Sequence, residues 1–501
     1  MSDKKSYRDI LRSSAIMGSA NMLEYLVSLL RVKIVAILLG PAGIGLIGLY
    51  ASVTSLLGTA TGLGITSSGV REVAQAYSKD DQEEAARIVR ILRRVCWCTG
   101  LAGWLVAIAL AQTLSELLFE SGEHAWAIGL LGSILLLSSI SSGQKSILQG
   151  QRRIGDIARI SVISMLLNTL ITVGLYYWLR EQGIVPVLVA TAAVSLAVSF
   201  WFSRRISIAP LKISWQETLT RAKGLAGLGS AFMISALLTA GVDMATRSLI
   251  TRDYGIEAAG LYQASWALSG LFAGFVISAM GTDFYPRLTA AIQDHATARQ
   301  LVNEQTEIGM LLALPGLLGT LAFAPLVMSV FYSDSFLPAA ELLPWFLLGV
   351  FGKVLSFPLG FIQLAMGAGR WFIITEVTTI TLQMFMIFWM VPRFGIIGAA
   401  YAFALTYFFY TLLMLWTARQ LIEFRWESGA RKVFFAASLL ISSSLASRLL
   451  LNEIGAIFFG TVILIAGAAF CIVELTKILG NEHRLSKFLN KMIPKTASRK
   501  L

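Results

Sequence analysis

Long apolar stretches, separated by short polar ones, fill most of this chain. About fourteen of them are roughly 18 residues or longer, close to the ~20 residues that a helix needs to cross a hydrocarbon core ~30 Å thick. Backbone amides and carbonyls find no water inside a bilayer, so each stretch is expected to be an α-helix. The predicted segments are 13–39, 44–67, 96–118, 125–143, 159–179, 184–203, 224–250, 258–283, 305–331, 340–367, 372–392, 396–417, 433–450 and 455–475.

The composition agrees with an all-α, polytopic membrane protein. Hydrophobic residues make up 56% of the chain and charged residues only 14%, which is far from the balance of an ordinary soluble enzyme. The first segment is too long for a cleavable signal peptide, and no small-residue cleavage site follows it.

Lysine and arginine residues are distributed unequally between the two sides of the predicted bundle. Counted from a cytoplasmic N-terminus, 33 of the 41 lie in the tails and loops of that side. The opposite loops hold only Arg180, Arg252, Arg393 and Arg448. This asymmetry predicts that both termini are cytoplasmic. Topology and contact with anionic lipids also account for the basic C-terminal tail, so no nucleic-acid partner is expected.

Two pairs of charged residues lie inside predicted segments, where charge is costly unless it faces water or a charged partner. Glu24 and Arg31 are seven residues apart and share a helix face. Asp243 and Arg247 have the i, i+4 spacing of a helical ion pair. Each pair can be a structural ion pair or part of a cavity that binds substrate. In the second interpretation the arginines bind an anion, and the two acids are candidates for proton or ion coupling.

Two lysines complete the set of charges assigned to the middle of the membrane. Lys33 lies about 200° around the helix from Arg31 at ~100° per residue, so it either extends to the membrane surface or lines the same cavity. Lys353 lies inside 340–367. Four basic residues against two acids favour a cationic cavity, which suits the transport of something anionic.

The chain repeats itself across these segments. The run Leu39–Gly58 matches Tyr254–Ala273 at an offset of 215, which pairs Gly40 with Gly255 and Gly45 with Gly260. A second match pairs Gly183 with Gly395 at an offset of 212, and Gly150-Gln-Arg-Arg corresponds to Gly367-Ala-Gly-Arg. The repeat covers six helices and both copies start on the same side, which indicates two parallel halves with substrate between them.

The repeat predicts the organisation of the chain. An N-terminal lobe of six helices should cover 1–222 and a C-terminal lobe of six should cover 223–420. Two peripheral helices should occupy 421–478, and a basic cytoplasmic tail 479–501. The GxxxG at Gly58–Gly62 is expected to be a site of close helix packing.

No motif for a cofactor, a metal or ATP hydrolysis is found in the sequence. Cys96, Cys98 and Cys471 are too few for a disulfide framework and have no metal-binding partner pair. The three histidines lie far apart in sequence, and there is no phosphate-binding P-loop. We therefore expect no metal, no cofactor and no enzymatic activity.

Three stretches resemble a known family. They are Gly40–Gly45, Leu148–Arg159 and, most specifically, Gly349–Gln383 followed by FGIIGAAYAF. In these the chain resembles the O-antigen translocases of the polysaccharide transporter family, and most of all the subgroup that includes the lipid III flippases. This family belongs to the MOP superfamily, which also holds the MATE exporters and the lipid II flippases.

The resemblance implies a two-lobed MATE-like bundle in the bacterial inner membrane that flips undecaprenyl-diphosphate-linked oligosaccharide for lipopolysaccharide synthesis. Membrane lipids, a polysaccharide polymerase and a chain-length regulator are the expected partners. With such a substrate, the cations that the charge pattern singles out, Arg31, Lys33, Arg247 and Lys353, would bind it, and Glu24 and Asp243 remain the candidates for proton or ion coupling. The alternatives are a lipid II flippase and a multidrug or cation antiporter, which would need an acidic cavity.

Overall fold

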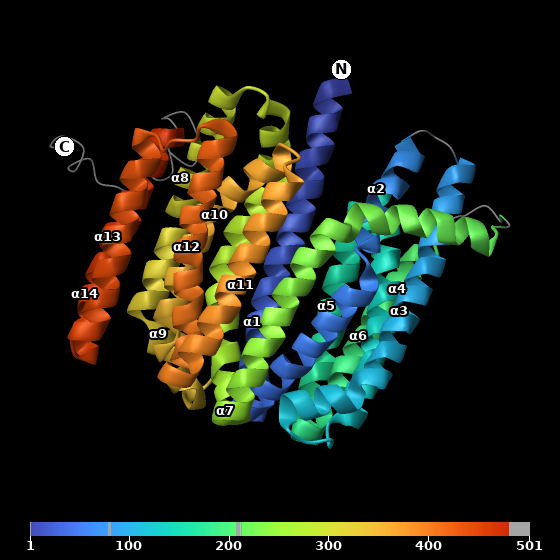
Figure 1. The fold of residues 1–501 in the computed structure, drawn as a ribbon, viewed down its shortest axis with the longest axis horizontal. Helices are drawn as coiled ribbons and strands as arrows, with labels where there is room; N and C mark the ends of the chain where they lie inside the picture. Colours follow the sequence, from blue (N-terminus) through green and yellow to red (C-terminus); the bar gives the residue numbers. More distant parts are fainter. Residues whose placement is uncertain (1, 79–81, 207–210, 212, 480–501) are drawn as a thin grey trace. The chain divides into compact units, whose positions relative to one another are not determined.

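The computed structural model describes residues 2–78, 82–206, 211 and 213–479; within these ranges the side chains of 2–21, 66–67, 78, 82, 225–232, 272–273, 275–283 and 479 are not described. Throughout these ranges the chain is helical, with short connections (Figure 1). The elements are α1 (Ser2–Gly62), α2 (Ile65–Ser78), α3 (Gln82–Phe119), α4 (Ala125–Gly150), α5 (Ile154–Leu179), η1 (Arg180–Gly183), α6 (Ile184–Ser203), α7 (Trp215–Ala291), α8 (His295–Ala322), α9 (Ala324–Phe331), η2 (Asp334–Glu341), α10 (Leu343–Ala365), α11 (Gly369–Phe394), α12 (Ile397–Ile422), α13 (Ser428–Leu450) and α14 (Glu453–Leu479).

Eleven helical stretches among the described residues are long and apolar enough to cross a membrane. Three of them, Met22–Gly62, Ile154–Ser203 and Met233–Leu271, are 41, 50 and 39 residues long. Each of these three covers two of the predicted segments. The prediction of an all-helical bundle with about fourteen membrane segments is therefore confirmed.

Two predicted segments are divided in the structure. The stretch 44–67 is interrupted at Leu63 and Gly64, which have positive φ, between the end of α1 at Gly62 and the start of α2 at Ile65. The stretch 305–331 was expected to be one helix, but α8 ends at Ala322 and α9 starts at Ala324. Between them Phe323 leaves the helical region, with φ −114° and ψ 28°. Pro325 has no amide hydrogen to donate to the carbonyl of Leu321, so an uninterrupted helix would lose a hydrogen bond here.

Helices α1 and α7 each contain one sharp bend at a glycine (Figure 1). Gly40 has φ 63° and ψ −169°, and Gly255 has φ 85° and ψ 168°. A Cβ would be strained at such positive φ values, and glycine has none. These are the two glycines that the sequence repeat paired, so the repeat is visible in the backbone.

The turn between α4 and α5 recurs between α10 and α11. Its central residue has positive φ in both copies, 56° at Arg152 and 65° at Gly367. In each turn the following residue donates its amide to the carbonyl five residues earlier, at 2.9 Å in both copies. The helices after the two turns, α5 and α11, are both 26 residues long and both end at a left-handed residue, Arg180 and Gly395.

All of these equivalent residues are 215 positions apart. The sequence pairing of Gly183 with Gly395 and of Gly150 with Gly367 is therefore wrong, by three and two residues respectively. That pairing aligned glycine with glycine, whereas arginine adopts the left-handed conformation in the first copy. The constant offset means that no gap separates the two copies over this region.

The chain divides into two compact units. Unit 1 comprises Met1–Gln263 with Val330–Phe336, and unit 2 comprises Ala264–Ser329 with Leu337–Leu501. In unit 1 α3 packs along α4, and in unit 2 α10 packs along α12. Each unit has its own apolar core. Buried members include Val89, Leu92, Ile147, Leu148 and Phe202 in unit 1, and Phe284, Leu288, Leu359, Met414 and Phe424 in unit 2.

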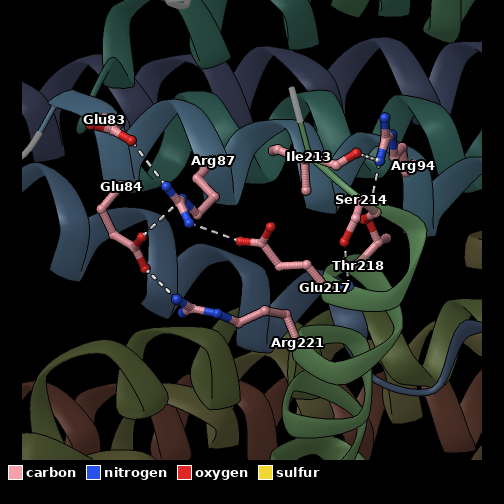
Figure 2. Close-up of polar contacts among 9 residues, drawn as sticks. All are labelled: Glu83, Glu84, Arg87, Arg94, Ile213, Ser214, Glu217, Thr218 and Arg221. Atoms are coloured by element: carbon pink, nitrogen blue, oxygen red, sulfur yellow. Dashed lines mark hydrogen bonds and ion pairs between the residues drawn. The ribbon is translucent and has the colours of Figure 1, made fainter. Parts of the chain in front are cut away.

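Within unit 1 the beginning of α7 is attached to the beginning of α3 by ion pairs (Figure 2). Arg87 of α3 lies 3.0 Å from the carboxylate of Glu217, and Arg221 of α7 lies 2.9 Å from that of Glu84. Two turns further along α3 the guanidinium of Arg94 donates to the carbonyl of Ile213 and lies over the ring of Trp215. The ion pairs are partly exposed, so each contributes modestly to stability.

A second attachment lies close to the bend of α7. Arg252 is 2.9 Å from the carboxylate of Glu120, directly after α3. The hydroxyl of Ser248 donates to the carbonyl of Leu117 at 3.0 Å. The stretch of α7 between the two attachments carries Asp243 and Arg247.

Candidate functional site

Arg247 is buried, whereas the other five charged residues that the sequence singled out are half-buried or exposed. Its side chain donates two hydrogen bonds, both 2.9 Å long. Nε donates to Oε1 of Gln263, and Nη1 donates to the carbonyl of Asp243. Nη1 also lies 3.9 Å from a carboxylate oxygen of Asp243. The guanidinium carbon is 5.8 Å from the ring centre of Tyr262.

The bend at Gly255 assembles this cluster. Arg247 and Gln263 are sixteen residues apart, which would separate them by ~24 Å along a straight helix. Because the chain turns at Gly255, the two side chains meet. Gly48 of α1 leaves the room that Gln263 needs, since a Cβ on Gly48 would lie 3.0 Å from its Oε1.

Helices α1 and α7 approach each other closely beside this cluster. A Cβ on Gly260 would lie only 1.9 Å from the carbonyl oxygen of Pro41, and one on Gly45 would lie 2.2 Å from that of Ile256. Gly45 and Gly260 each follow the bend of their helix by five residues. Each copy of the repeat thus uses one glycine to bend the chain and a second to admit the other helix.

The charged residues of α1 are less enclosed than Arg247. Glu24 is exposed, and Arg31 and Lys33 are half-buried. Among the described residues no carboxylate oxygen, that of Glu24 included, lies within the 4.0 Å of an ion pair from Arg31. The charge of Arg31 instead acts on the phenol of Tyr176 in α5. The structure does not bring Glu24 and Arg31 together as an ion pair.

Lys353 lies in unit 2, on α10, and is half-buried. Its ammonium nitrogen is 5.8 Å from the ring centre of Tyr407 on α12, a distance at which a cation and an aromatic face attract. Of the six predicted residues, Asp243 and Arg247 are therefore the pair whose contact the structure describes.

Unit 1 contains a cavity of about 750 Å³ that none of the six predicted residues lines. Its walls come from α1, α2, α3, α4 and α7 and are rich in hydroxyl groups. Arg71 is the charged residue among its lining residues. The hydroxyl-bearing residues are Thr54, Ser55, Thr59, Thr61, Ser68, Thr99, Ser138, Ser139 and Ser142.

Several of these hydroxyls already use their hydrogen within the protein. Thr54, Thr61 and Thr99 donate to the carbonyl four residues earlier, at 3.0, 2.8 and 3.0 Å, and Ser139 donates to the carbonyl of Cys96 at 2.8 Å. A hydroxyl oxygen that has donated its hydrogen still has lone pairs to accept with. This wall therefore suits a ligand rich in O–H and N–H donors, such as a sugar.

The sequence contained a signal for this cavity that the search for charges missed. Small and hydroxyl-bearing residues recur at helical spacing over Thr54–Ser68 and again over Ser138–Ser142. The expectation of close helix packing at Gly58 and Gly62 is wrong, because an added Cβ would have one neighbour, at 3.4 Å, and none within 4 Å, respectively. Both glycines line the cavity.

Comparison with known proteins identifies relatives over most of the chain. The model of a family described as "Polysaccharide biosynthesis protein" matches residues 34–341. The lipid III flippase of Escherichia coli (strain K12) is 24% identical over 434 residues, which cover 82% of this chain and 99% of the relative. A Shigella flexneri protein named for O-antigen transport is 22% identical over 388 residues, covering 75% and 90%.

Solved structures with the same fold come from two kinds of transporter. The lipid II flippase MurJ, in an inward closed conformation, gives a TM-score of 0.71 at 14% identity and covers 93% of this chain and all of its own. A multidrug transporter of the MATE family within the MOP superfamily, in an inward-facing conformation, gives 0.69 at 15% identity, covering 82% and 98%. At such identity the likeness establishes the fold alone.

Proposed function

Because this chain belongs to the family of polysaccharide biosynthesis proteins, we propose that it flips an undecaprenyl-diphosphate-linked, O-antigen-type oligosaccharide from the cytoplasmic to the outer leaflet of the bacterial inner membrane. The observation that carries the proposal is the similarity to a lipid III flippase over nearly the whole length of that relative. The chain would act as a transporter and not as an enzyme.

The physical task of such a protein is to keep a polar headgroup hydrated or hydrogen-bonded across ~30 Å of hydrocarbon. A diphosphate needs cationic donors, and arginine offers a planar fork that matches phosphate oxygens. A glycan needs many hydrogen-bond acceptors and donors in the protein, each of which contributes only weakly. Its polyprenyl chain can stay in the surrounding lipid.

The charged residues and the cavity of unit 1 supply groups of both kinds. In our proposal Arg247 binds the diphosphate, because its Asp243 contact, at 3.9 Å, is long enough for a phosphate to compete with it. The hydroxyl-lined cavity holds sugar units of the glycan. Arg31, Lys33 and Lys353 contribute further positive charge along the path.

The two carboxylates are the candidates for coupling to a proton or ion gradient. When a phosphate engages Arg247, the Asp243 carboxylate loses part of its electrostatic support, and taking up a proton becomes more favourable. Glu24, which is exposed on α1, is the second candidate for this coupling. An Asp243→Asn protein that responds to a proton gradient as the native protein does would rule out this role for Asp243.

The proposed topology and organisation follow from the charge asymmetry and the repeat. Both termini would be cytoplasmic, and lobes at 1–222 and 223–420 would alternate access to the substrate, with 421–478 as a peripheral pair of helices and 479–501 as a basic tail. A polymerase and a chain-length regulator would take up the flipped product.

The test is a transport assay in vesicles that contain the purified protein. Vesicles would be loaded in turn with a lipid-linked O-antigen repeat unit, with lipid II and with a fluorescent organic cation. We expect movement of the first substrate at least tenfold faster than that of the second, and none of the third. Faster transport of lipid II, or export of the cation, would replace the proposal with the corresponding alternative.

A further inference from the structure

One end of unit 2 contains a cavity of about 420 Å³ with charged groups on opposite walls. The end of α13 and the beginning of α14 form one wall, and the beginnings of α10 and α12 form another. The lining residues are Pro325, Glu341, Pro344, Trp345, Ile397, Tyr401, Leu445, Arg448, Leu449, Leu451, Glu453, Ala456 and Ile457.

The three charged residues of this cavity do not neutralise one another by direct contact. Arg448 is on α13, Glu341 precedes α10, and Glu453 begins α14. Both glutamates are close enough to act electrostatically on Arg448. Among the described residues, however, neither carboxylate comes within the 4.0 Å of an ion pair from the guanidinium. One cation and two anions around an open space suit a ligand that carries both signs of charge.

The charged cavity continues into an apolar groove. A second cavity of about 780 Å³ shares Trp345 and Tyr401 with the first, and their rings pack edge to face at 4.6 Å. Its remaining walls are almost entirely aliphatic and aromatic and come from α10, α11, α12 and α13. Along α12 the groove is lined from Tyr401 to Leu415, which is ~21 Å of helix. That length exceeds the ~15 Å of one leaflet of a ~30 Å core.

We propose that this composite site binds a phospholipid whose headgroup carries a phosphate and a primary ammonium, as phosphatidylethanolamine does. The phosphate lies against Arg448 and the ammonium between Glu341 and Glu453. One acyl chain follows the groove past Trp345 and Tyr401. The headgroup then connects three charges that otherwise remain apart, by charge-assisted hydrogen bonds.

The charge balance of the cavity selects this occupant over the polyprenyl diphosphate. Two carboxylates repel an anionic headgroup, and a diphosphate brings more negative charge than one arginine can balance. A phosphatidylglycerol headgroup has no cation to place against Glu341 and Glu453. A choline headgroup has the charge but no N–H to donate. An ethanolamine headgroup meets both requirements.

The predicted topology places this end of the bundle on the non-cytoplasmic side, because Arg448 is one of the few basic residues assigned there by the charge asymmetry. The bound lipid would belong to the outer leaflet. It would add a further link between α13 and α14 and the beginnings of α10 and α12, beside the stacked rings of Phe351 and Phe434 that already join α10 to α13. The site does not depend on which glycolipid the protein carries.

The proposal can be tested with delipidated, purified full-length protein in detergent. Phosphatidylethanolamine, phosphatidylcholine, phosphatidylglycerol and undecaprenyl phosphate, all titrated separately, serve as probes, with bound lipid counted by native mass spectrometry and stability followed by the thermal midpoint. We expect phosphatidylethanolamine to bind about tenfold more tightly than the others, as for the loss of one charge-assisted contact. Equal or tighter binding of any of the other three overturns the proposal.

Variants distinguish this site from general solvation by lipid. Arg448→Gln should weaken phosphatidylethanolamine binding about tenfold. The double variant Glu341→Gln, Glu453→Gln should reverse the preference in favour of phosphatidylglycerol, because the repulsion is gone. Ser438→Leu, which fills the groove and leaves the charges intact, should also weaken binding.

The control Arg419→Gln, at the exposed far end of α12, should change neither lipid binding nor the thermal midpoint. Unaltered lipid preference in the double variant contradicts the proposal.

Discussion

The bends of α1 and α7 follow the same pattern of two glycines five residues apart, but the arginines near the two bends lie in different environments. Gly40 and Gly255 turn the chain, and Gly45 and Gly260 let the two helices touch. The first glycine of each pair bends the chain and the second admits the other helix, in both copies of the repeat. At the first position the requirement is conformational, since a Cβ there would meet nothing within 4 Å. At the second position, Gly45 or Gly260, the requirement is for space, because a Cβ would collide with the backbone of the other helix.

The two arginines, Arg31 and Arg247, do not occupy equivalent positions in the two copies of the repeat. The residue equivalent to Arg31 in the second copy is Thr246, and the equivalent of Arg247 in the first is Val32. One residue corresponds to ~100° around a helix, so the two arginines leave their helices in different directions. Arg247 is built into a cluster with Asp243 and Gln263, whereas Arg31 has no ion pair with a carboxylate among the described side chains. The duplication thus fixed the backbone, and the chemistry of each copy arose separately.

The largest effect is expected where the two helices cross. In Gly260→Ala the new methyl would lie 1.9 Å from the carbonyl oxygen of Pro41, and in Gly45→Ala it would lie 2.2 Å from that of Ile256. Backbone cannot move aside as a flexible side chain can, so each variant should lose ~3 kcal/mol or more. We expect a lower yield of folded protein and a thermal midpoint lowered by several degrees.

The matched controls are Gly241→Ala and Gly270→Ala. Both glycines have ordinary helical φ, and an added Cβ meets nothing within 4 Å. Alanine is the better helix former, so these variants should be as stable as the native protein or slightly more stable. If Gly260→Ala were as stable as Gly241→Ala, the close crossing of α1 and α7 would not exist.

The next largest effect separates the two arginines. Arg247→Ala removes a buried guanidinium together with its hydrogen bonds to Gln263 and to the carbonyl of Asp243, so it should lower the thermal midpoint and abolish transport together. Arg31 makes no ion pair with any carboxylate that the structure describes, so Arg31→Ala should reduce transport at unchanged stability. Thermal unfolding and vesicle transport of the two proteins measure the contrast. Equal losses of stability would mean that the two sites are alike after all.

Most of the fold was predictable because the membrane restricts it so strongly. Length and hydropathy define the segments, and the glycines at 40, 45, 255 and 260 reveal the repeat, since each has a backbone reason to be glycine. The pairing failed where the first copy has arginine at a left-handed position, because a sequence comparison sees residue types and not φ angles. The residue type of Arg152 and Arg180 does not indicate that their backbones have positive φ.

The candidate site was predictable only in part. The i, i+4 spacing brought Asp243 and Arg247 together correctly, because that contact is local to one helix. Gln263 could not be added from the sequence, because it lies sixteen residues after Arg247 and reaches it only through the turn at Gly255. The hydroxyl-lined cavity was missed because serine and threonine are common in membrane helices, where they usually bond to their own backbone.

A moderate effect is expected from the bends themselves. Gly40→Ala and Gly255→Ala place a Cβ at φ 63° and 85° with ψ −169° and 168°, a region that only glycine adopts readily, and without any steric neighbour. The loss is therefore backbone strain alone, ~1–3 kcal/mol each. Two equal losses would show that both copies rely on the bend to the same degree. A loss at Gly255 well above that at Gly40 would instead show that the cluster of Arg247 and Gln263 depends on the angle of the turn.

The smallest effect tests the second pair of equivalent turns. Arg152 holds a positive φ of 56° with a side chain, whereas its counterpart Gly367 holds 65° without one. Arg152→Gly removes the strain but adds freedom to the unfolded chain, so we expect a gain within ~1 kcal/mol. Gly367→Ala should lose a similar amount, since no atom lies within 4 Å of its Cβ position. The two thermal midpoints should move in opposite directions. A gain from both substitutions would mean that the backbone of the two turns differs, and that the duplication is less regular than the constant spacing of 215 indicates.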